Sequence, residues 1–136
     1  MCIRDSSWEG IELPLDKDSI SDISSYLFDE FLKNSDKYKI VSYFRRSPGG
    51  SLLMFKIMHN YFLNEDLHVE ELIRKVPISI ASRLSLFTLI DTAVKKNFLI
   101  KEGSTGDKRM KSIIPSESFI KEYKDWLHIY VSGITR

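Results

Sequence analysis

Apolar residues recur at helical spacing through the first third of the chain. Four of them set the pattern at its N-terminal end: Ile20, Ile23, Leu27 and Phe31. This spacing predicts a helix over 19–33, with Ser19 as its N-cap and Asn34-Ser35 as its end. Residues 1–18 lack the pattern and are predicted to form a disordered arm. A second helix is expected over 36–46, because apolar residues recur there too.

The segment Ser47-Pro48-Gly49-Gly50 is the clearest break in the pattern. After it, Ser51 is a suitable N-cap for a helix over 51–64. Apolar residues occupy nearly every side of that helix, which is typical of a buried central helix.

The second half alternates short helices with strand signals. A very short strand at 67–69 and a short helix over 70–76 are predicted first, and Pro77 ends that helix. After a turn at 78–81, a helix is predicted from Ser82 to Lys96, with a buried stripe at Leu86, Leu89, Ile90 and Ala93. Asn97 tolerates the left-handed conformation that often ends a helix.

Two strands and a final helix complete the chain. Residues 98–102 and 109–114 predict a β-hairpin around a Gly-rich tip, and Ser116 caps a helix that runs to about Val131. The order helix, short strand, short helix, turn, long helix and hairpin is that of a winged helix-turn-helix. We therefore expect a mainly α fold with a small β-hairpin wing, in a single domain over 19–136.

In such a module the helix after the turn lies in the major groove of DNA, and its first side chains reach the bases. Ser82, Arg83, Ser85 and Thr88 are the polar candidates for these contacts. Arg83 could bind guanine in bidentate fashion or hold a phosphate. Leu84 and Phe87 either touch thymine methyl groups or belong to the core. The sequence leaves both pairs of alternatives open.

Three stretches resemble the MarR family of transcriptional regulators. They are Ser82 to Asp91, Lys95 to Glu102, and Asp107-Lys108-Arg109, with Pro115-Ser116 at the position where a capping Ser or Thr follows the wing. The resemblance covers residues 51–131 and implies a DNA-binding lobe over 51–115, with dimerisation helices over 19–33 and 116–131.

The resemblance also implies roles in the wing. Asp107 would brace it, Arg109 would contact DNA, and Lys108 and Lys111 would be further DNA-binding candidates. The chain departs from the family at Asn97, where glycine is usual, and in a longer turn over Pro77 to Ala81.

Charge is segregated along the chain, although its formal net charge is only +1. Residues 1–35 carry three basic and eight acidic side chains, whereas residues 69–111 carry nine basic and five acidic ones. A basic segment in a nearly neutral chain suits a local phosphate-binding surface, or an ordinary solvated helix face.

Nothing in the sequence indicates an enzyme, a cofactor or a metal site. His59, His68 and His128 do not have metal-ligand spacing, and no phosphate loop or nucleophile motif is present. Met1 to Ser6 resemble a translated sequencing adapter; without them the chain has no cysteine, which fits a reducing, cytoplasmic location.

The expected partners are double-stranded DNA and a second copy of the chain. The apolar stripes of the two terminal helices favour a homodimer, with packing of the two helices within one chain as the alternative. A small-molecule effector could lie among six apolar and aromatic residues, for which core packing is the other role: Tyr38, Tyr43, Phe44, Met54, Met58 and Trp126. The competing function is a winged-helix domain for protein assembly or non-specific DNA binding.

Overall fold

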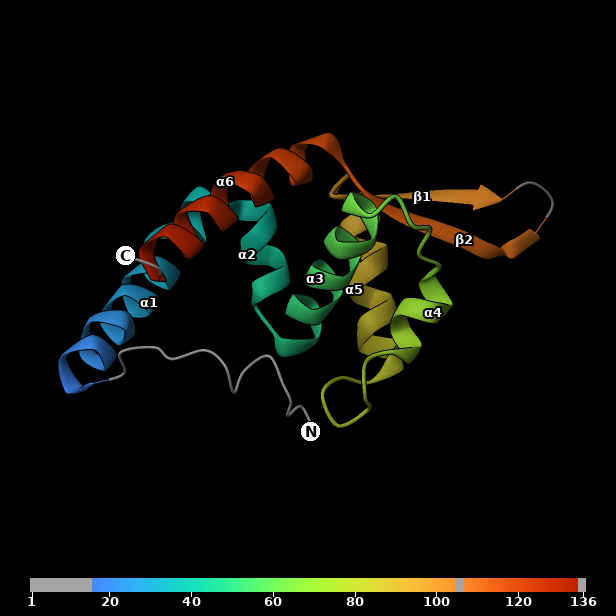
Figure 1. The fold of residues 1–136 in the computed structure, drawn as a ribbon. Coiled ribbons are helices and arrows are strands. Elements are labelled where there is room, and N and C mark those ends of the chain that lie inside the picture. Colours follow the sequence, from blue (N-terminus) through green and yellow to red (C-terminus); the bar gives the residue numbers. More distant parts are fainter. Residues whose placement is uncertain (1–15, 105–106, 135–136) are drawn as a thin grey trace.

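We describe the protein from a computed structural model that covers residues 16–104 and 107–134, with the backbone alone for residues 103, 104 and 107–111. Within these residues the chain forms six helices and one antiparallel hairpin, β1 with β2 (Figure 1). The elements are α1 (Lys17–Lys37), α2 (Lys39–Arg45), α3 (Pro48–Phe62), α4 (Val69–Arg74), α5 (Arg83–Lys95), β1 (Leu99–Ser104), β2 (Asp107–Pro115) and α6 (Glu117–Ile134). The prediction of a mainly helical fold with a small hairpin is confirmed.

Helix α1 is longer than the sequence pattern predicted. It begins at Lys17 because the side chain of Asp16, and not Ser19, caps it and accepts from the Ser19 amide at 2.7 Å. It also continues through Asn34 and Ser35, where a break was expected. Asn34 donates to Glu30 at 3.2 Å and Ser35 to the carbonyl of Phe31, so both side chains bond back along the helix instead of ending it.

Helix α3 begins at Pro48, inside the segment that was predicted to be a break. Ser47 caps it by accepting from the Gly50 amide at 3.1 Å, and Pro48 is in the first turn, where a missing N–H is tolerated. A Cβ atom on Gly50 would overlap the carbonyl oxygen of Phe44. Glycine therefore lets the first turn of α3 pack directly against the end of α2.

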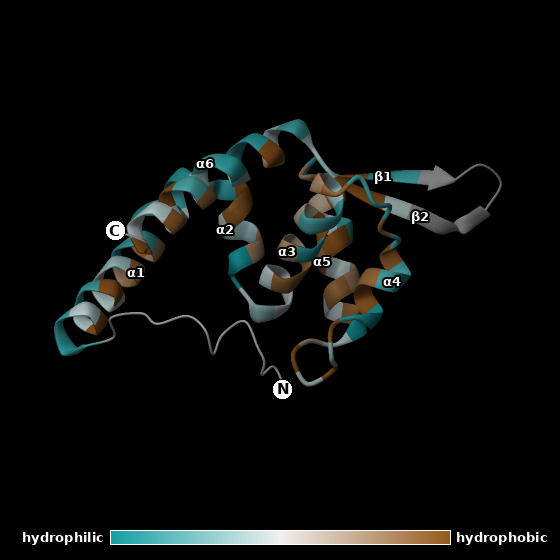
Figure 2. Cartoon of the chain, viewed as in Figure 1, coloured by the Kyte–Doolittle hydropathy of each residue, from teal (hydrophilic) through white to brown (hydrophobic). Residues whose placement is uncertain are grey.

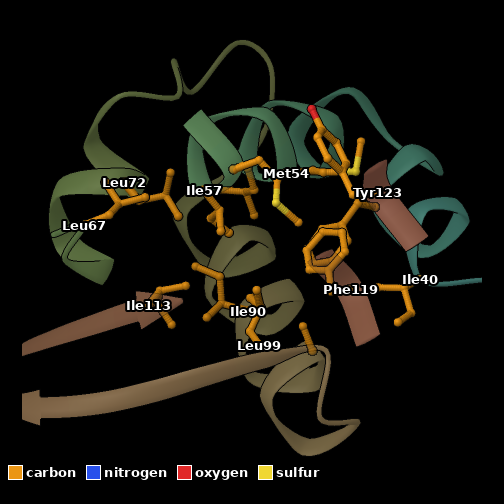
Figure 3. Packing of buried hydrophobic residues seen from close by; sticks show 14 of the residues in the cluster. Ile40, Met54, Ile57, Leu67, Leu72, Ile90, Leu99, Ile113, Phe119 and Tyr123 are labelled. Carbon is orange, nitrogen blue, oxygen red and sulfur yellow. The ribbon is translucent and has the colours of Figure 1, made fainter. Parts of the chain in front are cut away.

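The core lies between α3, α5, the base of the hairpin and the start of α6. Figure 3 shows side chains from these elements converging there, among them Met54, Ile57, Ile90, Ile113 and Phe119. The prediction that α3 is buried on all sides is wrong. Four of its apolar residues are 37–49% exposed, because its neighbours pack against one side only: Leu52, Phe55, Tyr61 and Phe62.

The second half of the chain follows its local signals closely. Asn97 has a φ of 64°, in the left-handed region, and so turns the chain from α5 into β1. The very short strand expected at 67–69 is reduced to a single β-bridge between His68 and Ser112. Beside it, the Ile113 amide donates to the Leu67 carbonyl at 2.9 Å. Ser116 caps α6 by accepting from the Phe119 amide at 3.2 Å.

A buried carboxylate joins α1, α2 and α6. Glu30 is 4% exposed and accepts two hydrogen bonds from Arg45, at 2.8 and 3.0 Å, and one from Trp126 Nε1 at 2.8 Å. The Arg45 guanidinium also lies over the Trp126 ring, 4.9 Å from its centre. We call Glu30, Asn34, Arg45 and Trp126 the Glu30 cluster.

The two terminal helices pack side by side within one chain. Tyr26 of α1 donates to the carbonyl of Ile129 in α6 at 2.5 Å, and in Figure 1 the two helices project together away from the hairpin. Intramolecular packing of the terminal helices, one of the two alternatives, is therefore present. Among the residues described, no helix is both long and apolar enough to cross a membrane.

Candidate nucleic-acid interface

The outer face of α5 is oriented by what its inner face contacts. Leu86, Ile90 and Ala93 are fully buried, as predicted, and Leu89 packs against the same core from its edge. With one side of the helix fixed in the core, the opposite side faces solvent over its first two turns.

The loop before α5 is anchored at one point. A Cβ atom on Gly49 would lie 2.9 Å from the Cβ of Ala81, so the loop approaches the first turn of α3 as closely as a glycine allows. The amides of Ile80 and Ala81 both donate to the Pro77 carbonyl, at 2.9 and 3.3 Å. These contacts hold the loop in a turn that leads into α5.

Ser82 is the N-cap of α5, as expected. Its hydroxyl oxygen accepts from the Ser85 amide at 3.1 Å and lies 2.9 Å from the Ser85 hydroxyl. Both residues are exposed, and their hydroxyl groups are bonded to one another. Two of the four predicted polar contacts therefore also serve to start the helix.

Arg83 is joined to the helix before it. Its Nη2 lies 3.0 Å from Oε1 of Glu70 in α4, with both side chains about half exposed. The guanidinium also lies over the ring of Phe87, 5.6 Å from its centre. Phe87 is partly buried against the core and supports Arg83, which favours the core alternative for Phe87.

Leu84 and Thr88 point away from the core. Leu84 is 77% exposed, which excludes the core alternative for this residue. Thr88 is exposed one turn later on the same helix. Beyond them, Asp91 pairs with Lys101 of β1 at 3.3 Å and so ties the middle of α5 to the hairpin.

The hairpin extends from the body of the protein on the side opposite α1 (Figure 1). Its base pairs Leu99 with Pro115 and Ile100 with Ile114, and the register shifts after Gly103. Four predicted wing residues belong to β2, but their side chains lie outside the described residues: Asp107, Lys108, Arg109 and Lys111.

Two residues of the turn are exposed that were not among the predicted site residues. Ile78 and Ile80 are 78% and 42% exposed, and they come immediately before α5. Their exposure could have been suspected from the sequence, because a five-residue turn with two isoleucines is unusual where polar or small residues are the rule.

The residues suggested to bind an effector lie in the core, and the described residues do not form a metal site. Of the six residues suggested for an effector, five are buried in the core and Tyr43 packs against it. The described residues contain no group of three or more His, Cys, Asp or Glu side chains that could hold a metal ion. His59 is exposed on α3.

Comparisons of the chain with family models, with curated proteins and with solved structures find no match.

Proposed function

We propose that this protein is a sequence-specific, duplex-DNA-binding transcriptional regulator of winged helix-turn-helix type. The observation that carries the proposal is the exposed outer face of α5, which follows an anchored turn and precedes an antiparallel hairpin. At about 1.5 Å per residue, α5 is long enough to lie along the major groove, and its N-terminal residues would then face the bases.

The charge around α5 supports the same function. From Glu70 to Lys96 the chain carries five basic and three acidic side chains, and two of the acidic ones, Glu70 and Asp91, are paired with Arg83 and Lys101. Phosphate groups attract such a segment, and phosphate contacts supply most of the affinity that does not depend on sequence. In the wing, Lys108, Arg109 and Lys111 would contact the backbone or the minor groove, braced by Asp107.

Arg83 is the best candidate for a direct base contact. An ion pair between half-exposed side chains contributes only about 0–1 kcal/mol, so little free energy is needed to separate Arg83 from Glu70. A bidentate contact with guanine would contribute about 1–3 kcal/mol of discrimination. Arg83 can therefore leave Glu70 for DNA, to bind either guanine or a phosphate.

We also propose a homodimer that forms through the paired terminal helices. Eight large hydrophobic residues of α1 and α6 are at least 36% exposed: Ile20, Leu27, Phe28, Phe31, Leu32, Ile129, Val131 and Ile134. Figure 2 shows hydrophobic positions recurring along α1 and α6. Many exposed large hydrophobic residues on two paired helices are typical of an interface. A two-fold dimer would place two α5 helices on successive half-sites.

A second candidate function is protein assembly by the same fold. The exposed Ile78 and Leu84 favour it, because apolar side chains also suit a protein partner. The two functions differ in how binding depends on sequence and salt.

The test is selection of bound duplexes from a random pool, followed by affinity measurements at several salt concentrations. A regulator should prefer its selected sequence over random duplex by at least ~10³. Equal affinity for all duplexes would leave non-specific binding, and no duplex binding would leave protein assembly. Sedimentation equilibrium of the free protein tests the dimer separately.

A further inference from the structure

Three aliphatic side chains are exposed around the start of α5. Ile78 is 78% exposed, Leu84 is 77% exposed and Ile80 is 42% exposed. Ile78 and Leu84 are the most exposed large hydrophobic residues in the described part of the chain. A single exposed leucine is ordinary, but three exposed aliphatic residues within seven positions of the chain are not. We call these three residues the α5 apolar group.

The fold holds this group at the surface. Ala81 takes the inward position of the turn against Gly49, and two amides of the turn bond to the Pro77 carbonyl. Figure 2 shows hydrophobic colour on the loop between α4 and α5, outside the body of the protein. The isoleucines of the turn therefore remain outside the core because the turn itself is fixed.

The surroundings of the group indicate what covers it. The stretch from Glu70 to Lys96 that contains it has five basic and three acidic side chains, and one of the acidic ones, Glu70, is paired with Arg83. An occupant that complements this surface must be anionic around its edge and must offer small apolar groups at its centre. Duplex DNA has that combination, because phosphates flank the major groove and thymine presents a C5-methyl group on its floor.

The polar groups at the start of α5 are mostly engaged. The hydroxyls of Ser82 and Ser85 bond to one another, and Arg83 is paired with Glu70. Thr88 is exposed one turn further along. Hydrogen bonds to DNA from this end of the helix would therefore come mainly from Thr88 and from Arg83 once it leaves Glu70, and the exposed Leu84 adds an apolar contact.

We propose that the α5 apolar group reads thymine methyl groups in the major groove, with Leu84 as the principal contact. The preferred duplex then carries thymines where the first turn of α5 meets the bases. This inference rests on the proposed DNA-binding function and specifies the class of sequence that the same site selects.

The experiment compares thymine with uracil at single positions of the selected duplex. Deoxyuridine keeps base pairing and the minor groove and removes only the C5-methyl group. We expect wild-type affinity to fall about threefold to fivefold at one or two thymine positions, as for the loss of one buried methyl group. Substitution at the other thymines should have no effect.

Two variants assign the effect to a residue. Leu84→Ala should bind the thymine duplex as weakly as wild type binds the uracil duplex, and it should lose nothing more when uracil is introduced. Leu63→Ala is the matched control, since Leu63 is also an exposed leucine, 54% exposed at the far end of α3. It should keep the full response to uracil. Melting curves should be nearly equal for both variants, because neither side chain is buried.

Three results would overturn the inference. One is duplex binding of normal specificity that does not respond to uracil at any position. A second is a Leu84→Ala variant that keeps the full response to uracil. In both cases DNA binding itself stands, and the α5 apolar group is assigned to a protein partner. Complete absence of duplex binding by wild type is the third result, and it removes the proposed function together with the inference.

Discussion

Glu30→Gln removes one charge from the Glu30 cluster while keeping the size of the side chain. Glu30 is 4% exposed and holds Arg45 and Trp126 by three hydrogen bonds between 2.8 and 3.0 Å. With its carbonyl in the place of Oε2, glutamine can still accept from Trp126, Asn34 and Arg45 Nη1. Its NH₂ group, in the place of Oε1, cannot accept from Arg45 Nη2, so the variant loses one hydrogen bond and the charge that pairs with Arg45.

The magnitude follows from what is left unpaired. Removing one partner of a buried ion pair costs about 3–5 kcal/mol. The Arg45 side chain is 18% exposed and still lies over aromatic rings, so part of its charge stays solvated or stabilised. We therefore expect Glu30→Gln to lower the free energy of unfolding by about 2–3 kcal/mol, near the value for a hydrogen bond to a charged group. Glu30→Ala should lower it by about 4 kcal/mol, because the Trp126 N–H then also lacks an acceptor.

The pH dependence of the same variant gives a second readout. Burial raises the pKa of Glu30, but hydrogen bonds from Arg45, Trp126 and Asn34 and the charge of Arg45 outweigh it, so the pKa lies below the ordinary value of 4.5. Because the folded-state pKa is lowered, the stabilisation is fully present above pH 4.5 and is lost as the pH falls through the folded-state pKa. The stability difference between wild type and Glu30→Gln should be constant near neutral pH and should shrink below pH 4.5.

Urea unfolding followed by circular dichroism, at one fixed protein concentration, measures both quantities. Arg45→Met is the complementary variant, and a double-mutant cycle with Glu30→Gln isolates the pair. A loss of less than about 0.5 kcal/mol for Glu30→Gln, typical of a surface site, would refute the reasoning. So would strict additivity of the two substitutions.

Three further predictions concern other parts of the chain. Gly50→Ala should destabilise the protein by about 3 kcal/mol in thermal unfolding, because the new methyl group meets the backbone carbonyl of Phe44, which cannot rotate away; an unchanged melting temperature would contradict this. Burial raises the pKa of Glu122, although backbone amides including that of Val41 donate to its carboxylate. The folded state therefore favours the protonated side chain, and the stability that this protonation gives the protein is present below pH 4.5 and is lost as the pH rises through the folded-state pKa. Glu122→Gln should accordingly match wild type at acidic pH and exceed its stability at neutral pH, in urea titrations at both values. Arg109→Ala should weaken binding to all duplexes and lower the salt slope by about one unit, and an unchanged slope would remove Arg109 from the interface.

The start of the candidate site could be predicted from the sequence, but its surface could not. Ser82 as N-cap and Asn97 as the left-handed end fixed the limits of α5, since both signals act within a few residues. The alternatives for Leu84 and Phe87 could not be separated, because both are apolar and only their neighbours in space differ. Leu84 faces solvent, whereas Phe87 meets the core.

The sequence by itself determined the second half of the fold, from the short helix at Val69 to the cap at Ser116. Its signals are local: a proline, a capping serine or an asparagine that tolerates positive φ changes the energy of its own backbone whatever the rest of the chain does. The tertiary structure decided the first half. Glu30 is buried because α2 and α6 pack against α1, and its partner Trp126 is ninety-six positions away. The exposed side of α3 likewise depends on which elements pack against it. Such contacts join segments that are distant in sequence, and no local pattern records them.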